Sequence, residues 1–262
     1  MKIRGCIFGG LAWMLLLFAC GPQRPADINL EQAHNPATQH IIAPGLGTIG
    51  LISQGSMHVY FHDEEDGQWY VDESSRFDLP EQNQGILAAG LGTIGVVKDQ
   101  VLQFYRLDSQ NRWKREMLYD FELPPGYDRL VAMKMPWDIG VIGIETNGVL
   151  RFFYFDQGWQ QDQTATYVIP EGITGYYAMG DMVIAITDDQ KLGLYYLGPE
   201  DGWEFMDEEA FVLLLPEAYE GIVPLDHRFI SVLQDGVLHF FQLDLTHDRW
   251  VSLSRLNFEL PW

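Results

Sequence analysis

Cysteine is scarce in this chain, with two residues among 262. Cys6 lies inside an apolar N-terminal run and Cys20 follows that run, so a chain processed between them keeps one cysteine and forms no intramolecular disulfide. The seven histidines show no paired spacing of metal ligands, so a structural zinc site is not expected. Stability must therefore come from the burial of apolar side chains, for which about 220 residues are ample.

The common motifs of catalysis are missing as well. The chain has no Gly-x-Ser-x-Gly turn and no candidate cysteine nucleophile. Residues 45–50 and 90–95 both read GLGTIG, which has the glycine spacing of a dinucleotide site, but a β-branched stretch follows each copy where that site needs a helix. We interpret both copies as tight turns between strands. The sequence predicts a protein that is not an enzyme and that uses no cofactor or metal.

Basic residues are few, since 16 lysines and arginines stand against 37 acidic residues, for a net charge of −21. A domain this acidic repels nucleic acid and anionic lipid headgroups, so nucleic-acid binding is not expected. Cationic partners are compatible with the charge. The simpler interpretation is that the charge keeps the protein soluble in a crowded compartment.

The N-terminal residues have the features of an export signal. Lys2 and Arg4 precede an apolar run over residues 5–19, which is short for a membrane span of about 20 residues and fits the apolar region of a signal peptide. The run ends in LFAC, which resembles the lipobox of bacterial lipoproteins. The resemblance implies that residues 1–19 are removed and that Cys20 becomes the acylated N-terminus. An ordinary secretory signal and an uncleaved anchor are the alternatives.

The same resemblance implies a place in the cell envelope. Gly21 follows the cysteine where an aspartate would resemble the inner-membrane retention signal of enteric bacteria, so we expect the outer membrane. Loss of residues 1–19 leaves 14 basic and 37 acidic residues, a net charge of −23. Residues 20–40 are polar and contain three prolines, and we interpret them as a tether of about 25 Å. Within it, residues 27–32 echo residues 77–82 and could add a strand to the domain.

A tryptophan follows a polar turn five times, at intervals of 44 to 47 residues, and a proline follows each tryptophan. These residues are Trp69, Trp113, Trp159, Trp203 and Trp250, with Pro80, Pro124, Pro170, Pro216 and Pro261. A period near 45 residues built of short strands is typical of β-propeller blades. We predict an all-β domain over residues 41–262, a five-bladed β-propeller with four antiparallel strands in each blade. The blades are expected near residues 41–85, 86–129, 130–175, 176–221 and 222–262.

Each copy contains the same four stretches. It opens with an apolar segment that carries a small residue at its third place, and we expect these segments to line the axis with alanine and aliphatic groups. A nearly continuous apolar strand, an aromatic-rich strand and an outer strand from the tryptophan to the proline follow. Two ways of closing the ring stay open: direct packing of the last blade on the first, or a strand contributed by residues 27–32.

The repeated tryptophans have two interpretations. Each indole packs an outer strand onto the neighbouring blade, or the five rings form sugar-stacking platforms. A packing rule must recur in every blade and a binding site need not, so we favour packing. Trp137 lies outside the repeat in a longer first turn of the third copy, while Asp226 and His227 end the inner strand of the last copy. These three residues are the candidate ligand contacts, near one mouth of the ring.

The spacing of residues 41–262 resembles that of tachylectin-type lectins, which are five-bladed propellers with a recurrent tryptophan after a polar turn. The glycine–tryptophan pairs that precede a Phe-x-Phe strand in those lectins are missing here, so the resemblance implies sugar binding only as a second hypothesis. The first hypothesis is a lipid-anchored, non-enzymatic propeller that binds or scaffolds an envelope partner. A glycoside hydrolase comes third, because the inner strands supply one acid, Asp226, and that reaction uses two.

Overall fold

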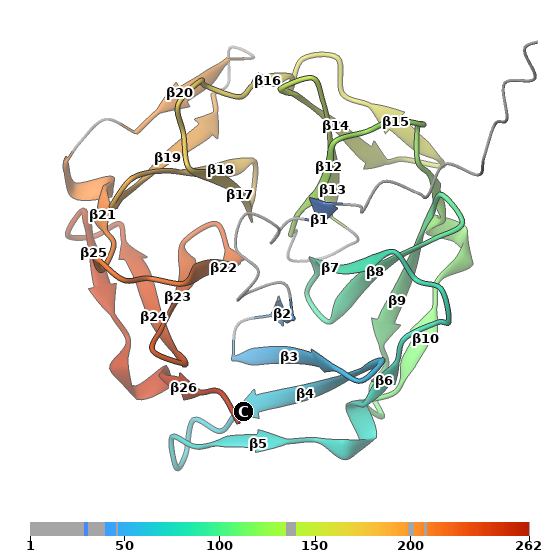
Figure 1. The fold of residues 1–262 in the computed structure, drawn as a ribbon, viewed down its shortest axis with the longest axis horizontal. Coiled ribbons are helices and arrows are strands. Elements are labelled where there is room, and N and C mark those ends of the chain that lie inside the picture. The colour runs from blue at the N-terminus through green and yellow to red at the C-terminus, as the bar shows by residue number, and fades with distance from the viewer. Residues whose placement is uncertain are drawn as a thin grey trace, which may run out of the picture.

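The computed structural model describes residues 29–30, 40–45, 47–134, 140–198, 202–206 and 209–261. These residues form five sheets arranged radially around an axis, and the chain visits them in order round the ring (Figure 1). Consecutive strands within each sheet are antiparallel. The fold is the five-bladed β-propeller that the repeat predicts. Cys20 and Trp137 lie outside the described residues.

Each blade repeats one order of strands from the axis to the rim. The innermost strands are β2 (Ile41–Gly45), β7 (Gly85–Gly90), β12 (Arg129–Met133), β17 (Gly175–Gly180) and β22 (Gly221–Asp226). The second strands are β3 (Thr48–Ser53), β8 (Thr93–Lys98), β13 (Val141–Thr146), β18 (Val183–Asp188) and β23 (Phe229–Gln234). The third strands are β4 (Ser56–His62), β9 (Val101–Leu107), β14 (Val149–Phe155), β19 (Lys191–Leu197) and β24 (Val237–Asp244).

The burial of these strands follows the hydrophobic pattern of the sequence. The inner two strands are buried on both faces, because the neighbouring blades cover them, and β8 is buried along its first five residues. The third strands begin with a buried residue at every second position, as in β9, so one side chain in two points into a seam. The seams between blades, rather than a single centre, therefore hold the core.

The outer strand differs from the single stretch that the sequence predicts. In every blade it consists of two pieces that both pair with the third strand. The pieces are β5 (Trp69–Val71) and β6 (Phe77–Asp78), β10 (Trp113–Arg115) and β11 (Phe121–Glu122), β15 (Trp159–Gln161) and β16 (Tyr167–Val168), β20 (Trp203–Phe205) and β21 (Leu213–Leu214), and β25 (Arg249–Ser252) and β26 (Phe258–Glu259). The interruption lets the chain turn outward and back between the two pieces.

A short 3-10 helix joins the two pieces in four of the blades. These helices are η1 (Glu73–Ser75), η2 (Met117–Tyr119), η3 (Glu209–Phe211) and η4 (Ser254–Leu256). In the third blade the place of the helix is taken by a turn around Asp162, whose Oδ1 accepts hydrogen bonds from the backbone N–H groups of Thr164 and Ala165. The third blade therefore offers its neighbour a different backbone surface.

The hydrophobic core is divided into five clusters, one between each pair of neighbouring blades. Phe104 of the second blade and Ile142 of the third, for example, are both fully buried in one cluster. Phe152 and Phe240 occupy the position of Phe104 in two other blades and are buried to the same degree. Because each cluster joins two blades, burial of apolar area holds the ring together from blade to blade.

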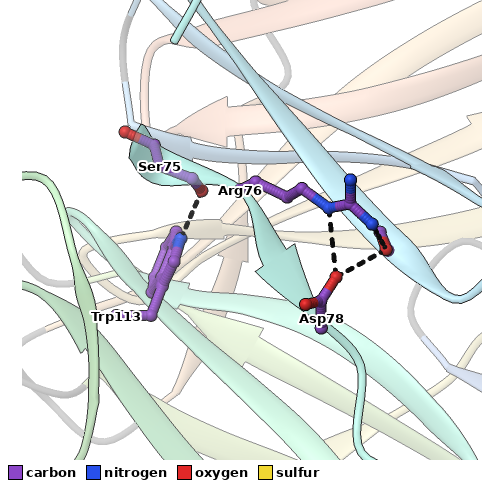
Figure 2. Close-up of polar contacts among 5 residues, drawn as sticks. Ser75, Arg76, Asp78 and Trp113 are labelled. Atoms are coloured by element: carbon purple, nitrogen blue, oxygen red, sulfur yellow. Dashed lines mark hydrogen bonds and ion pairs between the residues drawn. The ribbon is translucent and has the colours of Figure 1, made fainter. Parts of the chain in front are cut away.

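The repeated tryptophans pack across these seams, which confirms the packing interpretation. The ring of Trp113 lies 5.8 Å from that of Phe77 in the preceding blade, and its Nε1 donates to the carbonyl of Ser75 at 2.7 Å (Figure 2). Equivalent bonds to the last residue of the preceding 3-10 helix join Trp69 to Leu256 at 3.0 Å, Trp159 to Tyr119 at 2.9 Å and Trp250 to Phe211 at 3.0 Å. Trp203 faces the third blade, which lacks the helix, and its buried Nε1 has no hydrogen-bond partner among the described residues.

The ring closes by direct packing of the fifth blade on the first. Ile41 and Val223 share one cluster, and the bond from Trp69 to Leu256 crosses this seam. The short strand β1 (Asn29–Leu30) lies elsewhere, since it pairs in parallel with the start of β12 in the third blade. Of the two closures that the sequence leaves open, packing is therefore the one adopted.

The innermost strands depart from the expected alanine and aliphatic lining in the third blade. Arg129 begins β12, Lys134 follows it, and both side chains are buried. The Arg129 Nη2 donates to the carbonyl of Tyr176 at 3.0 Å, and the guanidinium lies 4.0 Å from the centre of the Tyr176 ring. The Tyr176 hydroxyl in turn donates to Glu145. This network provides the partners that a buried cation requires, and burial raises the pKa of Tyr176.

Candidate functional site

Charged residues that the repeat does not explain gather at one mouth of the channel. We call this the exit mouth, the end at which the innermost strands finish, at Gly45, Gly90, Met133, Gly180 and Asp226. Neighbouring blades are bonded to one another there. The backbone N–H of Gly92 donates to Pro44 at 2.7 Å, and that of Gly140 donates to Ala89 at 3.0 Å. Side chains at this mouth are therefore displayed from a backbone that adjoining blades hold in place.

The two GLGTIG segments form the first turns of the first two blades. Gly47 and Gly92 have φ angles of 70° and 61°, and a strand follows each of them. The final glycine of each segment serves packing, since a Cβ on Gly95 would lie 2.7 Å from Leu102 Cδ1. The interpretation of these segments as turns is confirmed.

The first turns lie at the exit mouth and carry different types of residue in different blades. The turn is Gly-Leu-Gly in the first two blades, where Leu91 is 64% exposed. The fourth blade has Gly-Asp-Met over residues 180–182, and the fifth has Asp-His-Arg over residues 226–228. These positions are equivalent because the strand pairings at the turns match: Gly90 with Thr93, Gly180 with Val183, and Asp226 with Phe229. The mouth therefore has an apolar side and a charged side.

A histidine joins two carboxylates on the charged side. The Nδ1 of His227 lies 2.9 Å from Asp181 Oδ2 and 3.8 Å from Asp226 Oδ1. Asp226 Oδ1 also accepts the backbone N–H of Arg228 at 2.8 Å. The three side chains are 30%, 38% and 35% exposed, so water screens the pair and its contribution to stability is small. They are accessible to a ligand while being held in a defined arrangement.

Lys134 extends the charged side from the third blade. Its Nζ donates to the carbonyl of Pro224 in the fifth blade, although the fourth blade lies between them in the chain. Gly180 allows this approach, because a Cβ there would lie 2.8 Å from the carbonyl oxygen of Lys134 and 3.2 Å from the backbone nitrogen of His227. Three blades thus meet at one point of the mouth.

The sequence identified part of this arrangement. Asp226 and His227 are brought together at one mouth, while Trp137 lies outside the described residues. Asp181 and Lys134 are further members of the arrangement that the sequence analysis does not include. Asp181 stands where Leu91 stands in the second copy, so an alignment of the first turns contains a signal for it. Lys134 directly follows the inner strand of the third copy and is the first charged residue after Arg129, which is a second signal in the sequence.

Other polar features of the described residues do not form a site of this kind. His58 and His62 lie on the same strand, and no group of three or more His, Cys, Asp or Glu side chains in the described ranges could hold a metal ion. No helix in the part of the chain that the structure describes is long and apolar enough to cross a membrane.

No family model matches the chain, and no curated protein sequence matches it. Solved structures resemble it in fold. A protein from Bacteroides fragilis described as a "putative 6-phosphogluconolactonase" has 12% identity and a TM-score of 0.38, over 82% of this chain and 68% of that one. A protein from Lactobacillus plantarum has 12% identity and a TM-score of 0.40, over 79% and 67%. Kluyveromyces lactis Hsv2p has 9% identity and a TM-score of 0.42, over 85% and 99%. Similarity this distant carries no argument about function.

Proposed function

We propose that the protein is a lipid-anchored, non-enzymatic component of the bacterial outer membrane whose propeller binds a protein partner at the exit mouth. The observation that carries the binding role is the asymmetry of that mouth. Turns with matching strand pairings present Leu91 in the second blade and Asp181, Asp226 and His227 in the fourth and fifth. Folding alone requires no such difference, because the Gly-Leu-Gly turn already joins the two strands. Binding of a partner across the mouth gives a reason for it.

The chemistry of the mouth favours a partner with both apolar and basic groups. Exposed Leu91 offers an apolar contact, and the partly exposed carboxylates of Asp181 and Asp226 accept hydrogen bonds from lysine or arginine. Protein interfaces combine such an apolar centre with a polar rim. The net charge of −23 that remains after loss of residues 1–19 attracts a basic partner over a longer range.

Crosslinking at the mouth tests the binding role. A photo-reactive amino acid at position 91 should capture one main envelope protein in intact cells, and the capture should fall at least tenfold with Asp181→Asn or His227→Ala. The matched control is Leu118→Ser on the rim, where the leucine is 73% exposed and away from the mouth. Equal capture by the mouth variants and the control would refute binding at this mouth. Sugar recognition there stays a prediction, which the same variants test on a glycan array.

A labelling experiment tests the anchor separately. Cys20→Ser should abolish incorporation of radioactive palmitate and move the protein from the membrane fraction to the soluble fraction, since stable anchoring needs more than one acyl chain on the cysteine. Retention of the label in the Cys20→Ser protein would contradict the proposed attachment site. Separation of inner and outer membranes by density then tests the proposed location.

One observation favours a second candidate, glycoside hydrolysis. The sequence supplied one acid on the inner strands, but the turn of the fourth blade brings Asp181 to the same histidine as Asp226. Two carboxylates are what that reaction uses. Release of a chromophore from aryl glycosides, lost in both Asp181→Asn and Asp226→Asn, would support it. Activity unchanged by these two substitutions would exclude this pair as the catalytic one.

A further inference from the structure

A pocket of about 380 Å³ lies at the seam where the fifth blade meets the first, the two blades that adjoin near the C-terminus in Figure 1. We call it the seam pocket. Phe61 from the first blade and Phe229, Leu253 and Leu256 from the fifth form its apolar lining. Its volume lies within the range of about 300–1,000 Å³ that is usual for small-molecule sites. The pocket is distinct from the exit-mouth cluster of Asp181, Asp226 and His227, none of which lines it.

The seam pocket contains a polar residue where the repeat has apolar ones. His62 ends β4 and pairs with the repeated tryptophan of its blade, Trp69. The residues paired with the tryptophan in the other four blades are Leu107, Phe155, Leu197 and Leu243. The other four blades thus carry an apolar side chain at this position. The first blade carries a histidine there, and this histidine lines the pocket.

The histidine at position 62 lowers the stability of the fold. Its Nε2 is buried and has no hydrogen-bond partner in the described part of the chain, although the ring packs 5.2 Å from that of Trp69. Leaving a buried polar atom unpaired is unfavourable, whereas a leucine at this position would carry no such atom. A ligand that hydrogen-bonds to Nε2 would remove that cost.

A second departure from the repeat lies among the lining residues that the fifth blade contributes. Arg255 is the middle residue of η4, and the middle residues of the other three helices are the uncharged Ser74, Leu118 and Ala210. Arg255 from the fifth blade and Glu64 from the first both line the pocket. Within the described residues neither of them forms an ion pair. Among the residues that the structure describes, the pocket therefore presents one unpaired cation from the fifth blade and one unpaired anion from the first.

We propose that the seam pocket binds a small zwitterion with an apolar side chain, namely a free α-amino acid or a dipeptide. The ligand carboxylate pairs with Arg255, its ammonium group pairs with Glu64, and its side chain lies against Phe61 and Phe229. His62 and Gln242 also line the pocket and supply polar groups for hydrogen bonds to the ligand. A zwitterion has no net charge, so the acidic protein neither repels nor concentrates it. This site does not depend on the partner proposed for the exit mouth.

Calorimetric titration with single amino acids tests the proposal. Among the standard L-amino acids, L-phenylalanine, L-leucine or another apolar member should bind with a Kd of about 1 mM or tighter. For L-phenylalanine as probe, phenethylamine and 3-phenylpropionate each lack one charge and should bind at least about tenfold more weakly, because each loses a charge-assisted bond. Methyl glucoside is the neutral comparator. Binding of the glucoside in preference to every amino acid and dipeptide, or no binding of any of them at about 10 mM, would overturn the proposal.

Matched variants locate the binding. His62→Leu installs the residue that three other blades carry, so it should leave the thermal midpoint unchanged or higher while weakening binding at least about fivefold. Arg255→Ala and Glu64→Gln should weaken it about tenfold. Arg249→Ala and Glu65→Gln remove exposed charges of the same two blades that do not line the pocket, and should leave the affinity unchanged. Wild-type affinity in all three pocket variants would show that the amino acid binds elsewhere.

Discussion

Replacing each repeated tryptophan by phenylalanine should cost more stability where the indole N–H has an acceptor than where it has none. Trp113 donates to the carbonyl of Ser75 at 2.7 Å, whereas the Nε1 of Trp203 is buried without a partner. The two indoles occupy equivalent positions in their blades, but Trp203 has a second aromatic neighbour in the preceding blade, Phe152 at 5.5 Å. Each is half-buried and packs edge to face on an aromatic ring of the preceding blade, 5.8 Å away for Trp113 and 5.1 Å away for Trp203. Trp159 also has two such neighbours, Phe104 at 5.7 Å and Phe121 at 5.0 Å, so the comparison of Trp159→Phe with Trp203→Phe isolates the hydrogen bond.

The expected difference follows from the cost of the unmade bond. Trp113→Phe removes the donor and leaves the carbonyl of Ser75 without its partner, which together costs about 1–3 kcal/mol beyond the loss of apolar area. Trp203→Phe loses a similar apolar area but also removes a buried N–H that was already unsatisfied. The free energy of unfolding should therefore fall by about 1–3 kcal/mol more for Trp113→Phe. In a domain of this size that corresponds to a midpoint lower by about 2–8 °C.

Urea unfolding followed by circular dichroism measures the difference without relying on tryptophan fluorescence, which both substitutions change. Trp159→Phe serves as a second bonded case, because that indole donates to Tyr119 at 2.9 Å, and it should behave like Trp113→Phe. Equal losses for Trp113→Phe and Trp203→Phe would show that the repeated tryptophans act only through apolar packing. A larger loss for Trp203→Phe would refute the reasoning altogether.

Three further outcomes follow from the structure. Burial raises the pKa of Tyr127 to about 12, and burial also raises the pKa of Tyr177 to about 12. Unfolded phenols lose their protons near pH 10, so the folded state holds more protons than the unfolded state between about pH 10 and 12. The free energy of unfolding therefore falls as pH rises through that window. Tyr127→Phe should make this fall shallower when the thermal midpoint is measured as a function of pH. Gly95→Ala should lower the free energy of unfolding by about 1–3 kcal/mol in chemical unfolding, because the new Cβ would lie 2.7 Å from Leu102 Cδ1. Gly202→Ala is the control and should leave the free energy of unfolding unchanged, since no atom lies within 4 Å of its Cβ position. Asp181→Asn should change the thermal midpoint by about 2 °C or less, since its partly exposed pair with His227 is screened by water, and a much larger drop would assign the pair a structural role.

The sequence predicted the ring because the repeat expresses a rule that every blade obeys. Trp69 and its four equivalents each lie across a seam, and that regularity is visible as a spacing along the chain. The break in the outer strand was not predictable in the same way. The helices Glu73–Ser75 and Met117–Tyr119 share no residue pattern, and their common feature is a carbonyl placed for the tryptophan of the next blade. Such a role belongs to the packed structure rather than to local propensity.

The candidate site was predictable only in the part that lies within one copy. Asp226 and His227 are neighbours in sequence, so noticing one brings in the other. Asp181 contacts His227 across a blade boundary, and that distance depends on how far the two blades are rotated about the axis. Lys134 directly follows an apolar strand in the sequence, and its amino group reaches Pro224 in the fifth blade. Contacts across the axis have no signature in the spacing of a repeat.

The position of the seam pocket gives a further reason to expect an effect of ligand on stability. Four seams join blades that follow one another in the chain, but the seam between the fifth and first blades is held only by contacts such as Ile41 with Val223 and Trp69 with Leu256. A ligand that bridges Glu64 and Arg255 adds a link between these same two blades. It binds the closed ring and not the unfolded chain, so at 100 times its Kd it should raise the free energy of unfolding by about 2.7 kcal/mol. Opening of this seam alone would already destroy the pocket, so amide hydrogen exchange in β2 and β22 should slow on binding while exchange at the seam of the second and third blades stays unchanged.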